Sequence, residues 1–322
     1  MKLRTALVFV FVFAFISVVA VASEYPAKQI RIIVQFTPGT STDILARLIA
    51  AKMGERWNQQ VVVDNKPGAG AVLGTDLGAK AAPDGYTLTM AVSSAFGINP
   101  SLYSKLPYDA INDFAPIANL GLTPQTLVVN PAESYKTLKD FVAAAKAKPG
   151  SINFASLGSG STSHLTTEMF AATAGIKLNH VPFKGSADAH TQIIGGQVPM
   201  MFDAIPATQP HIKSGRLRGL GIATLKRSPF LPDLPTIAEG GYTGFEAVGW
   251  IGIAAPAKTP VAVLNTLNAE MVRILGEADV KEKLNTLAFT PVGDTREQFA
   301  AYIKSEIAKW GKAVKDSGAK AE

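Results

Sequence analysis

Two kinds of hydrophobic pattern alternate along this chain. Short runs rich in β-branched residues are followed by longer runs in which apolar residues recur at helical spacing, and this order predicts a layered α/β protein. Strands are expected at residues 30–36, 61–64, 87–92, 126–129, 152–155, 180–183, 200–203, 217–223 and 250–255. Helices are expected at residues 42–53, 72–81, 138–147, 163–174, 188–194 and 207–214.

The last part of the chain carries helix signals only. Thr259 and Pro260 predict a helix start with proline at the first helical position, and this helix extends to about residue 275. Another helix is expected at residues 279–287, and a capping box at Thr295 and Gln298 opens a long helix to about residue 315. Because these helices are too small to form a domain alone, we expect them to pack on a sheet formed by the rest of the chain.

One strand–loop–helix pattern occurs twice, at residues 30–54 and 152–175. At a constant offset of 121 residues, Gly39 aligns with Gly160 and Ile49 aligns with Phe170. In both copies a strand ends in small hydroxyl residues that run into a helix, which leaves backbone N–H groups free to bind an anion. Two such loops suggest a cleft that holds a negatively charged ligand from both sides.

The two loops supply most of the candidate ligand-binding residues. Those of the first loop are Thr40, Ser41, Thr42 and Asp43, and those of the second loop are Ser159, Gly160, Ser161 and Thr162. Such hydroxyls can also simply cap a helix, but their recurrence favours a ligand site. A catalytic serine is disfavoured, because Leu157 stands where the G-x-S-x-G elbow pattern around Ser159 requires glycine.

Three further side chains are candidates for the cleft. His164 lies in the first turn of the helix beside the second loop. Phe183 can form an apolar wall or lie in the core, and the adjacent Lys184 is interpreted as a solvated cation. Asp203 ends an apolar strand, where a carboxylate faces the crevice of an open α/β sheet. There it can bind an ammonium group or water, or it can cap the next helix.

Composition indicates an exported protein without a metal or cofactor. Residues 1–22 have the basic start, apolar run and A-x-A site of a secretory signal peptide, with cleavage near Ala22. The chain has no cysteine, and its four histidines form no zinc motif. The formal charge of +6 is scattered rather than clustered with aromatic residues, which argues against nucleic acid as a partner. We expect a monomer in the periplasm.

Two segments are expected to cross between domains. Residues 125–131 and 249–256 both end in proline and lie on either side of the second copy of the repeat. The simplest division gives one lobe from residues 23–124 plus 247–322 and a second lobe from residues 125–246. The two crossing strands then form a hinge, with a cleft that closes around a ligand.

Several stretches together resemble one known family. They are residues 25–31, 38–47, 64–70, 83–88, 98–103, 158–165 and 180–185, in this order along the chain. Their combination resembles the periplasmic solute receptors of tripartite tricarboxylate transporters, often called Bug-type receptors. The resemblance implies a two-lobed, type II periplasmic-binding-protein fold that closes on one small ligand, usually a carboxylate.

The resemblance also implies how the ligand is held. Backbone and hydroxyl groups of the two loops bind the carboxylate, partly through water. The neighbourhoods of Ser93, Ser94 and Ala187 line the cleft as well, and Asp203 matches an acidic position there. One departure concerns Thr40, because the first loop of the family usually reads P-G-G. A side chain at this position can narrow the pocket or add a hydroxyl contact.

These observations predict a non-catalytic receptor that binds an organic mono- or dicarboxylate and delivers it to a membrane permease. Two alternatives remain at this point. One is an exported serine hydrolase that uses Ser159 or Ser161 with His164 and Asp203, and the other is a ligand sensor that feeds a two-component system. The class of carboxylate stays open among aliphatic, aromatic, amino-acid and nicotinate-like ligands.

Overall fold

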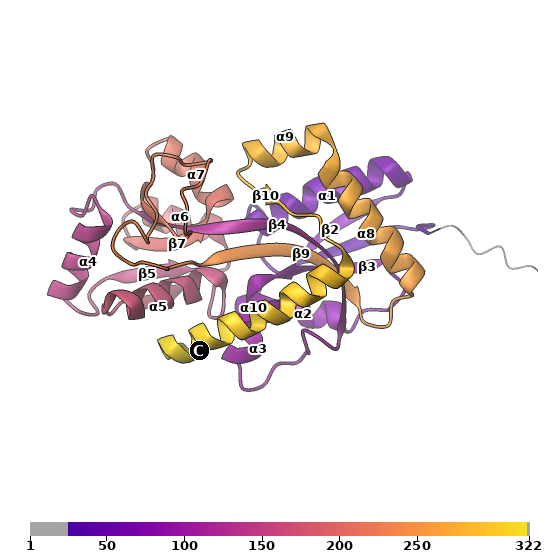
Figure 1. Cartoon of the computed structure of the whole chain (residues 1–322), viewed down its shortest axis with the longest axis horizontal. Helices are drawn as coiled ribbons and strands as arrows, with labels where there is room; N and C mark the ends of the chain where they lie inside the picture. The colour runs from indigo at the N-terminus through magenta and orange to yellow at the C-terminus, as the bar shows by residue number, and fades with distance from the viewer. Residues whose placement is uncertain (1–24, 321–322) are drawn as a thin grey trace, which may run out of the picture.

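A computed structural model describes residues 25–320, so the expected signal peptide at residues 1–22 lies outside the described residues. The strands form one mixed sheet in the order β2-β1-β3-β9-β4-β7-β5-β6, and β8 and β10 also pair with β4 (Figure 1). Their bounds are β1 Ile30–Val34, β2 Val61–Asn65, β3 Thr87–Val92, β4 Phe114–Val129, β5 Asn153–Ser156, β6 Asn179–Pro182, β7 Met200–Ala204, β8 Arg218–Ile222, β9 Val248–Pro256 and β10 Thr290–Pro291.

The helices match the expected positions closely. Their bounds are α1 Ser41–Trp57, α2 Val72–Ala79, α3 Asn99–Leu102, α4 Leu138–Ala147, α5 Thr162–Ala174, α6 Ser186–Ile194, α7 Ile205–Lys213, α8 Val261–Gly276, α9 Ala278–Thr286 and α10 Arg296–Ser317. Short turns η1 Ala69–Ala71 and η2 Ser94–Ile98 precede α2 and α3. The predicted capping box of α10 is confirmed, whereas Pro260 occupies the N-cap of α8 and not its first helical position.

The duplicated strand–loop–helix unit is present as two equivalent substructures. β1 lies between β2 and β3, and β5 lies between β6 and β7, with parallel pairing in all four cases. Gly39 and Gly160 adopt φ values of 86° and 81°, which favour glycine, and a hydroxyl residue caps the helix that follows each of them. The same local sequence therefore builds the same turn twice.

β4 is much longer than the sequence pattern predicts. Only residues 126–129 were expected to be a strand, but the strand begins at Phe114. Pro116, Gly121 and Pro124 weaken the strand signal of the earlier residues, and the register against β9 shifts near Pro116 and near Gly121. Proline is tolerated where a bulge interrupts the ladder, so the weak pattern still forms a strand.

β4 and β9 connect two lobes, each with its own hydrophobic core. The first part of β4, up to Pro124, pairs with β9, whereas residues from Gln125 onward pair with β7 and β8. In Figure 1 the two strands run through the centre of the molecule between the lobes. The predicted two-lobed fold with two crossing strands is confirmed.

α10 contacts both lobes. Phe299 and Ile303 are part of the core that contains β1–β3, whereas Trp310 and Val314 are part of the core that contains α5. Figure 1 shows the helix lying along the molecule from one lobe towards the other. The expectation that the C-terminal helices pack on the existing body is confirmed, since α8 packs against β4 and α10 against β4 and α5.

Candidate ligand-binding site

A small cavity of about 50 Å³ lies between the lobes where the two duplicated loops face each other. Most of its wall consists of hydroxyl side chains. They belong to Thr40, Ser41, Thr42, Ser93, Ser94, Thr123, Ser161, Thr162, Ser163 and Ser186. The site therefore combines neutral hydrogen-bonding groups from both lobes, as the repeat predicts for Thr40, Ser41, Thr42, Ser161 and Thr162.

Hydrogen bonds to the Asp43 carboxylate hold the first loop in place. The Thr40 hydroxyl caps α1 by accepting from the Asp43 amide at 3.4 Å, and the Asp43 carboxylate accepts from Gly39 N at 3.0 Å and from Asn65 Nδ2 at 2.9 Å. Burial alone would raise the pKa of Asp43, but hydrogen bonds from Arg47, Gly39 and Asn65 hold it below its ordinary value. Asp43 does not line the cavity; it fixes the loop that does.

The second loop has a comparable support in His164. Ser161 caps α5 by accepting from the His164 amide at 3.2 Å, and Nδ1 of His164 accepts from Gly160 N at 3.2 Å. The ring stacks on His180 with centroids 4.1 Å apart. Burial, and secondarily the nearby His180, lower the pKa of His164 to about 3, so the ring is neutral and Nδ1 is free to accept.

This geometry does not support the hydrolase hypothesis for Ser161. Its hydroxyl caps the helix and lies 3.0 Å from the hydroxyl of Ser163, while the ring of His164 is directed to the Gly160 amide. A nucleophilic serine requires its hydroxyl to donate to the base. Asp203, the third proposed member, contacts His190 and not His164.

A third helix begins at the cavity. α6 follows Gly185 without a side-chain cap, so the amide groups of its first turn are not satisfied by an N-cap side chain. Sequence reasoning placed this helix two residues late and named Ala187, which is exposed and does not line the cavity; its neighbour Ser186 does. The pair Gly185 and Ser186 before an amphipathic run is the signal that would have identified this start.

Three cavity hydroxyls are buried without any hydrogen-bond partner among the described residues. They are the Oγ atoms of Ser41, Ser94 and Ser186. Their residues are 7%, 1% and 3% exposed. Leaving a buried hydroxyl unpaired is unfavourable, so three around one cavity indicate a polar ligand. Ser41 and Ser94 come from one lobe and Ser186 from the other.

Asp203 is the acidic side chain at this cavity. It is 4% exposed, its Oδ1 accepts from Ala204 N at 2.8 Å, and its Oδ2 lies 3.1 Å from Nε2 of His190. No lysine or arginine lines the cavity within the part of the chain that the structure describes. The groups that this cavity offers to an anion are therefore amides, hydroxyls and helix N-termini, with His190 next to the one carboxylate.

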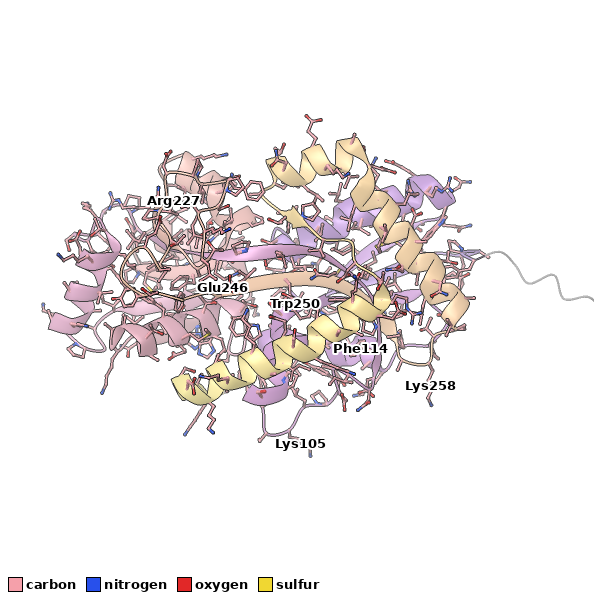
Figure 2. The ribbon with its side chains drawn as sticks, viewed as in Figure 1. Lys105, Phe114, Arg227, Glu246, Trp250 and Lys258 are labelled. Atoms are coloured by element: carbon pink, nitrogen blue, oxygen red, sulfur yellow. The ribbon has the colours of Figure 1, made fainter. Side chains whose placement is uncertain are left out.

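The crossing strands form the floor of the cavity. Thr123 and Gln125 come from β4, and Trp250 and Ile251 come from β9. Sequence reasoning placed both strands at the hinge but assigned them no ligand contact. Figure 2 marks Trp250 beside α10, where its Nε1 donates to Glu306 at 3.0 Å.

The lobes are in contact around the cavity. The hydroxyls of Ser93 and Thr162 lie 2.7 Å apart across the cleft, and Tyr103 Oη donates to Ser159 O at 3.3 Å. Ser159 and Phe183 line a second, outer cavity, and Gly160 lines neither of the two. The structure therefore represents a closed arrangement of the cleft.

Comparison with known proteins identifies the family. Residues 45–319 match the TctC family, described as "Tripartite tricarboxylate transporter family receptor". The chain belongs to this family. It is similar to the structure of the periplasmic binding protein BugD, at 32% identity and a TM-score of 0.88 over 92% of this chain and 100% of that one. The resemblance inferred from the sequence motifs is confirmed.

Two similar solved structures contain small dicarboxylates. Rpa4515 of R. palustris with adipate is 33% identical, with a TM-score of 0.90 over 92% of this chain and 99% of that one. MatC of Rhodopseudomonas palustris with bound malate is 32% identical, with a TM-score of 0.86 over 90% of this chain and 100% of that one. The chain therefore belongs to a family of solute-binding receptors, and its structural neighbours are receptors and not enzymes.

Proposed function

We propose that this TctC-family receptor binds a small organic carboxylate in the interlobe cavity and delivers it to the membrane permease of a tripartite transporter. The observation that carries the proposal is the group of unpartnered hydroxyls at Ser41, Ser94 and Ser186. They are the first residues of α1, η2 and α6, and the first backbone amides of a helix have no partner within the helix.

A carboxylate satisfies this arrangement better than a neutral or cationic solute. Each of its two oxygens accepts more than one hydrogen bond, which matches hydroxyl and amide donors that converge from two lobes. The dipoles of α1, α5 and α6 favour negative charge at their N-termini. The adipate and malate complexes of the similar receptors support the same class of ligand.

Closure of the lobes is the proposed functional event. We infer that residues 23–124 with 247–322 form one lobe and residues 125–246 the other, hinged at β4 and β9. Ligand bound between Ser41 and Ser186 joins the two lobes, because these residues lie on opposite sides of the cleft. The closed surface then presents a shape that a permease can distinguish from the open receptor.

The proposed location is the periplasm, after cleavage of the signal peptide near Ala22, and the receptor is proposed to act as a monomer. No helix among residues 25–320 is long and apolar enough to cross a membrane. Within this proposal Ser41, Thr42, Ser93, Ser94, Thr162 and Ser186 contact the ligand, and Asp43 and His164 position the two loops.

Mass spectrometry of ligand carried through a native purification tests the proposal. The wild-type protein and the double variant Ser41→Ala/Ser186→Ala are each purified without added carboxylates and then denatured. The small molecules that the two proteins release are compared. We expect an organic acid in the wild-type fraction that is depleted in the double variant. A carried solute without an acidic group, retained equally by both proteins, would contradict the proposed ligand class.

A further inference from the structure

A buried carboxylate and a buried imidazole lie next to each other at the interlobe cavity. Asp203 belongs to β7 and lines the cavity, whereas His190 belongs to α6 and does not line it. The two residues are 4% and 3% exposed, and Nε2 of His190 lies 3.1 Å from Oδ2 of Asp203. Asp203 is therefore in contact both with the ligand cavity and with a titratable side chain outside it.

This contact is short but is not an aligned hydrogen bond. Neither His190 Nε2 nor Asp203 Oδ2 has a hydrogen-bond partner among the described residues, although Oδ1 of Asp203 accepts from Ala204 N at 2.8 Å. Leaving a buried polar atom unpaired is unfavourable, and leaving a buried charge uncompensated is more so. A proton on the imidazole would turn it into a cation beside the carboxylate, which compensates the charge whatever the alignment of the hydrogen bond.

A second histidine borders the pair but stays neutral near pH 7. The ring of His211, on α7, lies with its centroid 4.9 Å from that of His190. Burial lowers the pKa of His211 to about 4, and the neighbouring His190 and Arg216 lower it further than the opposing effect of Asp203 raises it. His190 is therefore the ring of this cluster that remains available to take up a proton at neutral pH.

The other charged groups around the pair are in contact with solvent. The strands on either side of β7, which are β4 and β5, contain no titratable residue, and α5 packs on the opposite face of β7 against Phe202. The charged side chains of α6, α7, β8 and the turns beside the two helices are partly or fully exposed, and they are Lys184, Asp188, Lys213, Arg216 and Arg218. Compensation of the Asp203 charge within the buried cluster therefore falls to His190.

A bound carboxylate and Asp203 have the same charge and little room between them. The cavity volume of about 50 Å³ corresponds to only a few water-sized groups, since one water needs roughly 10–15 Å³ by this measure. A carboxylate inside it therefore lies close to Asp203, which is the sole titratable side chain among the described residues that line the cavity. Like charges at short range in a buried site repel, and binding of a proton nearby relieves the repulsion.

We propose that His190 and Asp203 form a proton-binding site coupled to the anion site, so that the receptor takes up one proton with each carboxylate that it binds. The inference rests on the proposed function and adds a second bound species, a proton that passes from the solvent to the imidazole of His190. With this proton the pair has no net charge and the hydroxyls and helix N-termini bind the anion unopposed. Without it the charge of Asp203 opposes the anion, so affinity falls as the pH rises.

Calorimetric titration in buffers of different ionisation enthalpy measures the protons taken up on binding. Ligand-free protein, refolded from denaturant to remove carried solute, is titrated with straight-chain mono- and dicarboxylates of about two to eight carbons. The titrations run from about pH 6 to about pH 9, where simple carboxylic acids are ionised and the proton must therefore be bound by the protein. The acid of this panel that binds most tightly is then used for the variants.

Three variants separate the pair from its surroundings. We expect the wild type to take up about one proton per ligand within this pH range, with affinity falling by up to about tenfold per pH unit. His190→Asn should bind without proton uptake and more weakly at low pH. Asp203→Asn should also bind without proton uptake, but near pH 9 it should bind several-fold more tightly than the wild type. His211→Asn is the matched control and should keep the wild-type uptake.

The tighter binding of Asp203→Asn at high pH is the readout that a merely structural role would not produce, because loss of a structural contact weakens binding at every pH. If His190→Asn does not fold, Asp203→Asn alone decides. Binding without proton uptake by the wild type, uptake that persists in either variant of the pair, or uptake lost in His211→Asn would overturn the proton site alone. Binding of no acid in the panel would overturn the proposed function as well.

Discussion

At the residue scale, the hydroxyls of the site are of two kinds. Some have a hydrogen-bond partner within the protein, and others have none among the described residues. Thr40 and Ser161 cap helices, and their hydroxyls already accept from backbone amides. Ser41 and Ser186 lie one residue after an N-cap and have no partner for their Oγ atoms among the described residues. The first pair builds the loops and the second pair is available to the ligand.

The substitution Ser41→Ala separates these roles. Because the Ser41 hydroxyl makes no hydrogen bond within the protein, its loss should change the free energy of unfolding by less than about 0.5 kcal/mol. Carboxylate affinity should fall about tenfold, since a hydrogen bond to a charged group is lost. Thr40→Ala is the matched control and should cost about 1 kcal/mol of stability through loss of the N-cap. Chemical denaturation measures the free energy of unfolding, and calorimetry measures the carboxylate affinity. A Ser41→Ala protein that is destabilised but binds carboxylate normally would contradict the assignment of Ser41 to the ligand.

His164 gives the stability a defined pH dependence. Its pKa is lowered to about 3 in the folded protein, from an ordinary 6.5, so the unfolded chain takes up a proton below pH 6.5 that the folded protein excludes. Stability contributed by the neutral ring is therefore lost as the pH falls from 6.5 towards 3. Between pH 7 and pH 5 the loss attributable to His164 should be about 2 kcal/mol.

Denaturation of the wild type and of His164→Gln at both pH values checks this expectation. The glutamine variant keeps an acceptor for the Gly160 amide but does not titrate, so its stability should fall less over this range. An equal fall in both proteins would show that His164 is not held neutral by the fold.

The residues of the site could be predicted only in part. The hydroxyl loops at Thr40 and Ser161 have a pattern that repeats in the sequence, and this repetition identified them. Ser94, in the turn η2, was named only through the family resemblance, and Ser186 was missed although Gly185 before it marks a helix start. Asp43 and His164 were named as ligand-binding candidates, but neither lines the cavity and each instead hydrogen-bonds to its own loop. The contact of Asp43 with Asn65 has no signal in the sequence, because only the fold brings these residues together.

At the element scale, α10 links the hinge to the second lobe. The Glu306 carboxylate is 4% exposed and accepts from Trp250 Nε1 at 3.0 Å and from Trp310 Nε1 at 2.8 Å. Trp250 belongs to β9 and lines the interlobe cavity, whereas Trp310 packs in the core that contains α5. One buried carboxylate thus connects the cavity floor to a helix that contacts both lobes.

Removing that carboxylate should destabilise the protein strongly. Glu306→Ala leaves two buried indole N–H groups without an acceptor, and we expect a loss of about 3 kcal/mol in the free energy of unfolding. Glu306→Gln keeps an acceptor oxygen and should retain most of the stability. Thermal and chemical denaturation of the two variants measure this difference, and similar stability losses in both would contradict the acceptor role.

Elements with strong periodic patterns were predicted well, and those defined by pairing were not. β3 and α4 match their expected bounds, because their residues alternate or repeat within one segment. The first part of β4 contains two prolines and glycine and is a strand because β9 pairs with it. β10 has only Thr290 and Pro291, and its existence depends entirely on β4. Such long-range pairing leaves no local signal.

At the scale of the whole molecule, the proposed function depends on how closely the lobes approach. Gly185 of the second lobe has an extended backbone with φ of −178°, which any residue adopts. A Cβ atom at this position would nevertheless lie 1.8 Å from Oγ1 of Thr37 on the first lobe. The glycine is therefore required by the closed arrangement and not by its own backbone conformation.

The substitution Gly185→Ala should therefore hinder closure without unfolding either lobe. We expect about tenfold weaker carboxylate binding, from an overpacking cost of 1–3 kcal/mol that arises only on closure. Gly276→Ala is the control, because a Cβ atom there meets nothing within 4 Å. Small-angle scattering with and without ligand follows closure directly. Normal affinity and normal compaction in Gly185→Ala would show that the lobes need not approach this closely.

The proposed function requires the hydroxyl-lined cavity between the lobes to bind a carboxylate. Isothermal titration of the folded, ligand-free wild-type protein against a broad panel of mono- and dicarboxylates tests it most directly. Because Trp250 lines the cavity, its fluorescence reports binding in the same samples. We expect saturable binding of at least one carboxylate at a single site, with a matching change in fluorescence. A folded protein that binds no carboxylate in the panel would contradict it.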